Sequence, residues 1–139
     1  MQAFPSPRDH FASLEESELE KQCDIRFERR SGPGGQNKNK VETAVIFEHR
    51  PTGLRAEANE KRYQGENREV AIRRLRLKLA LEIRNPVSID SEPSPLWLSR
   101  IGKSGRIAVN PKHEVFPALL AESLDFAASC RWDVKTAAL

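Results

Sequence analysis

Residues 23–49 have the sequence CDIRFERRSGPGGQNKNKVETAVIFEH, and this stretch decides the fold. Residues 23–29 alternate apolar and charged side chains, a pattern typical of a strand with one buried face. Residues 43–49 are rich in β-branched and aromatic side chains and predict a second strand. Between them, three of the seven glycines lie within four residues, beside a proline, an amide and two lysines. Glycine reaches positive φ and admits a close backbone approach, so this loop is either a plain connection or a device that brings main-chain donors to a ligand.

The residues after the second strand continue the same sheet. Residues 50–53, RPTG, predict a turn, with Gly53 suited to positive φ. Residues 54–58 alternate again and predict a third strand, antiparallel to the second. A long helix is expected over 66–84, because Ile72, Leu75, Leu79 and Ile83 recur at helical spacing; Leu77 and Leu81 fall outside that stripe, and we expect another element to cover them.

The flanking segments are predicted from local signals. A short acidic helix is expected over Ser13–Lys21, with Ser13 and Glu16 forming a capping box. Residues 1–10 offer little to bury, and residues 86–100 are a linker rich in proline and serine. A short strand is expected at 106–109 and a second long helix at 116–130. We expect His49 and His113 to be structural and His10 to be exposed.

These elements predict an α+β fold. A small antiparallel or mixed β-sheet carries a long helix, with the glycine loop between the first two strands and a C-terminal helical extension. The predicted parts are 1–20 (tail and acidic helix), 21–85 (the sheet domain) and 86–139 (linker and extension).

Composition and charge narrow the class of protein. Apolar residues make up 38% of the chain and charged residues 31%, no apolar run could cross a membrane, and the N-terminus lacks a signal-peptide core. Two distant cysteines, Cys23 and Cys130, are expected to be free thiols in a reducing compartment, which favours the cytoplasm. Residues 21–84 carry sixteen Lys and Arg against nine Asp and Glu, a net charge of +7. From charge alone, the basic residues of 21–84 could bind a phosphate-rich partner or simply form a solvated surface.

Five short motifs occur in order over about fifty residues: SGPGGQ at 31–36 with Asn39, TAV at 43–45, HRPTG at 49–53, KRYQ at 61–64, and NR at 67–68 with Ala71. Gly-Gly-Gln alone is a weak motif, but the ordered set is specific. The stretch from Ser31 to Leu81 resembles the catalytic domain of class I peptide-chain release factors and their short ribosome-rescue relatives.

The resemblance implies hydrolysis of the ester that joins a nascent peptide to tRNA in the peptidyl-transferase centre of the ribosome. Gly34, Gly35 and Gln36 would be the catalytic residues. The glycines would let the backbone enter a crowded RNA pocket and aim the Gln36 N–H at the oxyanion of the tetrahedral state. The protein would need no cofactor and no metal.

The partners implied are peptidyl-tRNA and the large-subunit rRNA of the ribosome, with no membrane, and we expect a monomer. Phosphate contacts position a protein on RNA without specifying sequence. The residues expected to make them are Arg29, Arg30, Lys38, Asn39, Lys40, Arg73 and Arg74.

Two departures bear on function. Rescue relatives usually end in a basic tail, whereas residues 112–139 contain three Lys and Arg against four acids; Lys38 also stands where the family often has a β-branched residue. We favour a codon-independent peptidyl-tRNA hydrolase. The alternative is a non-catalytic ribosome- or RNA-binding module that keeps the scaffold. A standalone esterase would need a nucleophile–base arrangement that the sequence does not suggest.

Overall fold

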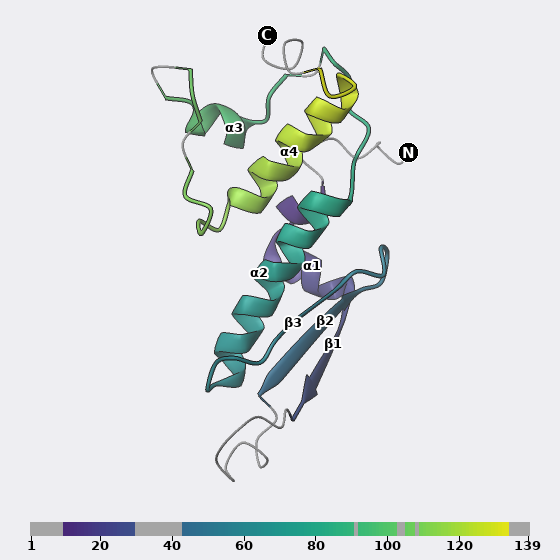
Figure 1. Cartoon of the computed structure of the whole chain (residues 1–139), viewed down its shortest axis with the longest axis vertical. Coiled ribbons are helices and arrows are strands. Elements are labelled where there is room, and N and C mark those ends of the chain that lie inside the picture. Colours follow the sequence, from purple (N-terminus) through teal and green to yellow (C-terminus); the bar gives the residue numbers. More distant parts are fainter. Residues whose placement is uncertain (1–9, 30–42, 91, 103–104, 108, 134–139) are drawn as a thin grey trace. The chain divides into compact units, whose positions relative to one another are not determined.

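The computed structural model describes residues 10–29, 43–90, 92–102, 105–107 and 109–133 (Figure 1). The chain forms two compact units, residues 15–78 and residues 1–14 with 79–139, and each is treated separately below. Helix α2 (Gln64–Glu82) contributes to both. The predicted division at residues 20 and 85 stays a prediction. No helix in the described part of the chain is long and apolar enough to cross a membrane.

The sheet of the first unit has three antiparallel strands in the order β1 (Cys23–Glu28), β2 (Ala44–His49) and β3 (Arg55–Ala58). β1 pairs with β2 from Cys23↔His49 to Glu28↔Ala44. The turn between β2 and β3 places Gly53 at a φ of 74°, where glycine is favoured over other residues. All three predicted strands and this turn are confirmed.

The central strand β2 supplies most of the core of this unit. Val45 and Phe47 are fully buried on the sheet face that also bears Ala56 and Ala58. α2 runs along the sheet (Figure 1) and contributes buried side chains that include Ala71, Ile72 and Leu75. The predicted α+β architecture is therefore present, with an antiparallel sheet. The expected glycine loop falls on residues 30–42, outside the described residues.

The N-terminal helix differs from its prediction. η2 (Phe11–Ser13) is a separate 3-10 turn, and α1 begins later, at Glu16, and ends at Lys21. The capping box is wrong: Glu15 occupies the N-cap without a side-chain hydrogen bond, and Ser13 Oγ donates to His10 O at 2.8 Å. Serine hydroxyls bond readily to nearby carbonyls, and this local bond replaces the cap.

The second unit contains a long helix, α4 (Phe116–Ser129), and a short one, α3 (Pro95–Arg100). α4 matches its prediction within one residue. α3 lies where only a linker was expected, because Ser94 Oγ accepts from Trp97 N at 3.1 Å and Pro95 suits the first helical turn. Instead of a strand at 106–109, the described residues there form a single bridge between Ile101 and Ile107.

The prediction of an exposed His10 is wrong. His10 is fully buried in the second unit: its Nδ1 accepts from Ala12 N at 3.0 Å, and its Nε2 lies 2.9 Å from Ile83 O. Leu81, expected to be covered, is 60% exposed. Cys23 and Cys130 are free, as expected, and both are buried.

Candidate functional site

The residues predicted to carry chemistry fall mostly outside the described part of the chain. Gly34, Gly35 and Gln36 lie within residues 30–42, as do four predicted RNA contacts, Arg30, Lys38, Asn39 and Lys40. Arg29 is described and exposed directly after β1, and Arg73 and Arg74 lie on α2. The roles of all these residues stay predictions. The structure describes the residues on either side of the segment 30–42, and we call the part of the sheet that carries them the base of this segment.

That base is the end of the sheet where Glu28 pairs with Ala44. β1 ends there, β2 begins there, and the first turn of α2 lies at the same end of the unit (Figure 1). Since Ala44 and Val45 are fully buried, β2 is fixed from its first residue.

Asn67 ties these elements together. Its side chain is fully buried, and its amide makes three hydrogen bonds. Nδ2 donates to Thr43 O at 2.7 Å and to Lys61 O at 3.1 Å, while Oδ1 accepts from Lys61 N at 2.8 Å. One amide therefore joins α2, the turn before it and the residue that leads into β2. We call Thr43, Lys61 and Asn67 the Asn67 clamp.

A second contact holds the first turn of α2 to α1. Arg68 Nη2 lies 2.7 Å from Glu20 Oε2, and both side chains are partly buried. The start of α2 is thus fixed by neighbouring residues, Asn67 toward β2 and Arg68 toward α1. Asn67 and Arg68 form the fifth sequence motif, whose structural role the sequence did not reveal.

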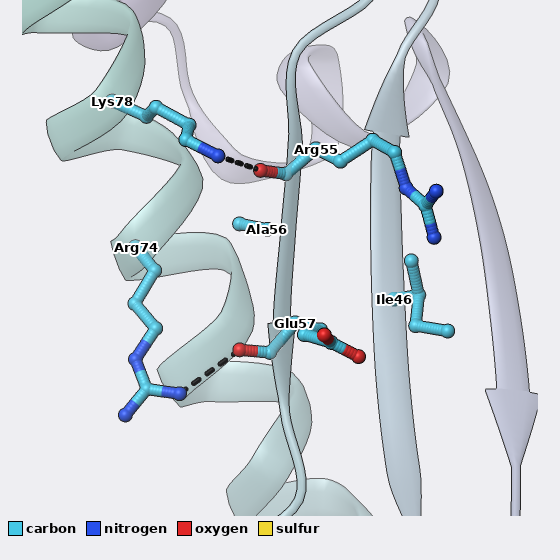
Figure 2. Close-up of a pocket in the computed structure, with 6 residues that line it drawn as sticks. All are labelled: Ile46, Arg55, Ala56, Glu57, Arg74 and Lys78. Atoms are coloured by element: carbon cyan, nitrogen blue, oxygen red, sulfur yellow. Dashed lines mark hydrogen bonds between the residues drawn. The ribbon is translucent and has the colours of Figure 1, made fainter.

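Arg74 and Lys78 contact the outer edge of β3 (Figure 2). Arg74 Nη1 donates to Glu57 O at 2.9 Å, and Lys78 Nζ donates to Arg55 O at 2.7 Å. Both cations border a hollow of about 420 Å³ that Ile46, Arg55, Ala56 and Glu57 also line. β3 is an edge strand, and these two carbonyls point away from β2, so the side chains of Arg74 and Lys78 supply their hydrogen-bond donors.

Arg74 also pairs with Glu60 in the turn before α2. Its guanidinium donates to both carboxylate oxygens of Glu60, with 3.1 Å between Nη1 and Oε1. Chiefly this hydrogen bonding lowers the pKa of Glu60 to about 2. Arg74 therefore has a structural role, and its predicted rRNA contact stays a prediction.

His49 lies at the far end of the sheet and is structural, as expected. It is fully buried; Nε2 lies 2.7 Å from Gln22 Oε1 and Nδ1 lies 2.8 Å from Thr52 Oγ1. Burial, with a smaller contribution from the charge of Arg50, lowers the pKa of His49. With both ring nitrogens engaged, this imidazole is unsuited to proton transfer with a substrate.

The described residues around Asn67 position the chain at the point where the segment 30–42 ends. Within the described part of the chain, no three His, Cys, Asp or Glu side chains meet as a metal site would require. The segment 30–42 begins where β1 ends on the sheet, and the residue that follows the segment, Thr43, is bonded to the start of α2. A rigid scaffold presents a functional segment in this way.

The buried Asn67 could have been recognised from its spacing. It precedes Ala71, Leu75 and Leu79 at intervals of four, so it lies on the inward stripe of α2. A buried amide requires hydrogen-bond partners, and an amide at the start of a helix can satisfy a neighbouring loop.

Comparison with known proteins places this geometry in a family. The model of the RF-1 domain matches residues 14–94, more than half of the chain. The chain is 50% identical over 60 residues to peptide chain release factor PrfB1, chloroplastic, of Arabidopsis thaliana, covering 43% of this chain and 13% of that protein. It is 46% identical over 69 residues to peptide chain release factor 1 of Lactococcus lactis subsp. cremoris (strain MG1363), covering 48% and 19%.

A third relative has a similar match: peptide chain release factor 1 of Streptococcus agalactiae serotype Ia is 46% identical over 70 residues, which cover 48% of this chain and 20% of that protein. The chain thus spans a fifth or less of the length of these relatives. The matched region contains the three strands, all of α2 with the Asn67 clamp, and the segment 30–42. By this match, the chain belongs to the RF-1 domain family of peptide-chain release factors.

Proposed function

We propose that this chain hydrolyses the ester bond of peptidyl-tRNA on the ribosome. The observation that carries the proposal is the sequence Gly34-Gly35-Gln36 in the segment that joins β1 to β2 within the RF-1 match. A binding module has no need of this tripeptide, whereas ester hydrolysis has a use for a backbone donor on a narrow loop. The Asn67 clamp supports the proposal because it fixes the residue that ends this segment.

The proposed reaction adds water to the carbonyl carbon of the ester. A tetrahedral intermediate forms with a negative charge on the former carbonyl oxygen, and the main-chain N–H of Gln36 donates to that oxygen. The attacking water gives up one proton as this intermediate forms. When the intermediate collapses, the bond to the ribose oxygen of the tRNA breaks and that oxygen takes up a proton, and the new carboxylic acid releases the second proton of the water to solvent. The products are a free peptide carboxylate and deacylated tRNA. One such donor is worth about 3–4 kcal/mol in comparable sites.

The Gln36 side chain would help to place the water, and ribosomal RNA would supply the remaining groups. Gly34 and Gly35 would allow the backbone to turn the Gln36 N–H toward the ester. Binding to the ribosome would draw on Arg29, Arg30, Lys38, Asn39, Lys40 and Arg73, through phosphate contacts that do not depend on RNA sequence.

The test is release of labelled peptide from purified ribosome complexes. We expect the wild-type chain to release peptide from complexes with truncated mRNA, and Gly35→Ala to abolish release while ribosome binding persists. Gly65→Ala is a matched control, because an added methyl group there would meet no atom within 4 Å. Binding by the wild type without release would contradict the hydrolase and favour the non-catalytic module.

We propose further that release is independent of the codon. The support is that the proposed chemistry draws only on residues of the RF-1 match, 14–94, and on the peptidyl-tRNA ester, and that none of the contacts proposed above is to mRNA. Complexes carrying a stop codon should then release peptide no faster than complexes with truncated mRNA. Release that requires a stop codon would overturn this part of the proposal and leave hydrolysis itself intact.

A further inference from the structure

Two aromatic side chains are exposed at the end of the first unit from which the segment 30–42 departs. Among the described residues of 15–78, the large apolar side chains left exposed are Phe27, at 41%, and Tyr63, at 62%. Phe27 is next to the last residue of β1, and Tyr63 directly precedes α2. Both aromatic side chains are therefore accessible to a partner.

Tyr63 has a cation beside its ring. The Arg62 guanidinium carbon lies 5.8 Å from the ring centroid of Tyr63, within the range of a cation–π contact. The guanidinium can cover only one face of the ring, and the exposure of Tyr63 shows that much of the ring meets solvent. A tyrosine with a cation on one face and solvent at the other can stack a planar ligand.

The backbone that carries this pair is held by hydrogen bonds. The Asn67 clamp holds Lys61, two residues before Tyr63, against Thr43, and Tyr63 O accepts from Asn67 N at 3.1 Å. The backbone on both sides of Arg62 is therefore anchored. This stretch of backbone would not have to be ordered at the moment of binding, which lowers the entropic cost.

The charge around the ring favours an anionic ligand. Lys61 and Arg62 precede the ring directly, and the carboxylate of Glu60 is paired with Arg74. Glu66, in the first turn of α2, is an exposed acid nearby in the sequence. An unpaired nucleotide combines the two properties that this site can bind, a flat base and a phosphate.

We infer that Tyr63 and Arg62 form a stacking site for an unpaired base of RNA, with Lys61 contacting the adjoining phosphate. The inference rests on the proposed function only for the source of that RNA, which would be the ribosome. It places an RNA contact in the turn before α2, next to the point where the segment 30–42 ends.

The first experiment uses RNA alone, so its outcome does not depend on peptide release. Because Tyr63 is the only tyrosine in the chain, selective labelling gives a single set of ring signals in an NMR titration. The probe is single-stranded oligoadenylate of about ten nucleotides, close to the site size of known single-strand binders. We expect the ring signals to move upfield, and Tyr63→Ala to weaken binding about tenfold, as loss of one base–aromatic stack does.

Three comparisons make this result specific. Tyr63→Phe should bind within about twofold of the wild type, because stacking needs the ring and not the hydroxyl. Trp132→Ala removes an equally exposed aromatic from the other unit and should leave binding unchanged. An abasic ribose-phosphate oligomer of the same length should bind more weakly and leave the Tyr63 ring signals in place.

Several outcomes would overturn the site. These are equal binding by wild type and Tyr63→Ala, equal losses for Tyr63→Ala and Trp132→Ala, or ring shifts as large with the abasic oligomer or with oligoglutamate. Ring shifts that are as large with either of these base-free polyanions would show that the site recognises negative charge and not a base. If RNA binds as expected and Gly35→Ala still releases peptide, the stacking site stands and the proposed chemistry fails.

Discussion

Replacing Asn67 with alanine tests whether one buried amide holds the base of the segment 30–42. The substitution removes both donated bonds, to Thr43 O and Lys61 O, and the bond accepted from Lys61 N. All three are partly buried, so water replaces them incompletely. At about 1 kcal/mol net for each bond, the free energy of unfolding should fall by about 3 kcal/mol.

This change is large enough to measure without ambiguity. For a chain of this length it corresponds to a fall in melting temperature of about 10 °C. Urea unfolding followed by circular dichroism gives the free energy and its dependence on denaturant. Asn59→Ala is the control, since Asn59 is an exposed amide in the turn before α2 and its loss should change stability by less than about 0.5 kcal/mol.

The same variant links the clamp to activity. Measured at a temperature where Asn67→Ala remains folded, peptide release should slow by about tenfold or more, because small displacements of a reacting group are costly. The affinity of Asn67→Ala for the ribosome should remain that of the wild type. Asn67→Asp keeps the bond from Lys61 N but directs a carboxylate at two carbonyls, so it should destabilise at least as much. A loss of stability no greater than that of Asn59→Ala would refute the reasoning.

Three further changes test other parts of the structure. Burial makes the pKa of His49 lower in the folded protein than its ordinary 6.5, so the unfolded chain takes up that proton first as the pH falls. The free energy of unfolding should therefore be at its full value above pH 6.5 and fall as the pH drops below it, and His49→Gln should remove that slope. Arg84→Met should lower the free energy of unfolding by about 3 kcal/mol, because the buried carboxylate of Asp125 loses the guanidinium that lies 3.0 Å away. In urea unfolding, the double variant with Asp125→Asn should regain part of that free energy. Ser94→Ala should lower the free energy of unfolding by about 1–2 kcal/mol and weaken the helical circular-dichroism signal, because the Ser94 hydroxyl accepts a hydrogen bond from Trp97 N at the start of α3.

The sheet could be predicted because its signals are local. Alternation over residues 23–29 and the β-branched run of 43–49 each specify a strand, and Gly53 specifies the turn. Periodicity also identified the inner face of α2, where Leu75 and Leu79 are fully buried. It could not show that Leu81 stays exposed, because that depends on which other segments reach the helix.

The errors involve contacts between distant residues or a signal that was overlooked. His10 is buried because its ring bonds to Ile83 O, 73 positions along the chain, and no local pattern encodes that contact. α3 does have a local signal, a serine cap followed by proline, but the proline-rich composition concealed it. At the candidate site the motifs indicated the family. The spacing of Asn67 indicates that it is buried, whereas its partners Thr43 and Lys61 and the contact between Arg62 and Tyr63 could be seen only in the structure.

The bonds from Arg74 and Lys78 to β3 also affect how molecules meet one another. A three-stranded sheet has two open edges, and an unpaired edge invites a strand from a second molecule to add to it. On β3 the two outward carbonyls, of Arg55 and Glu57, already accept from these side chains of α2. A strand from another molecule would first have to displace the side chains of Arg74 and Lys78 from these carbonyls. Helix α2 therefore opposes the addition of a second molecule at this edge, and with it aggregation through the sheet.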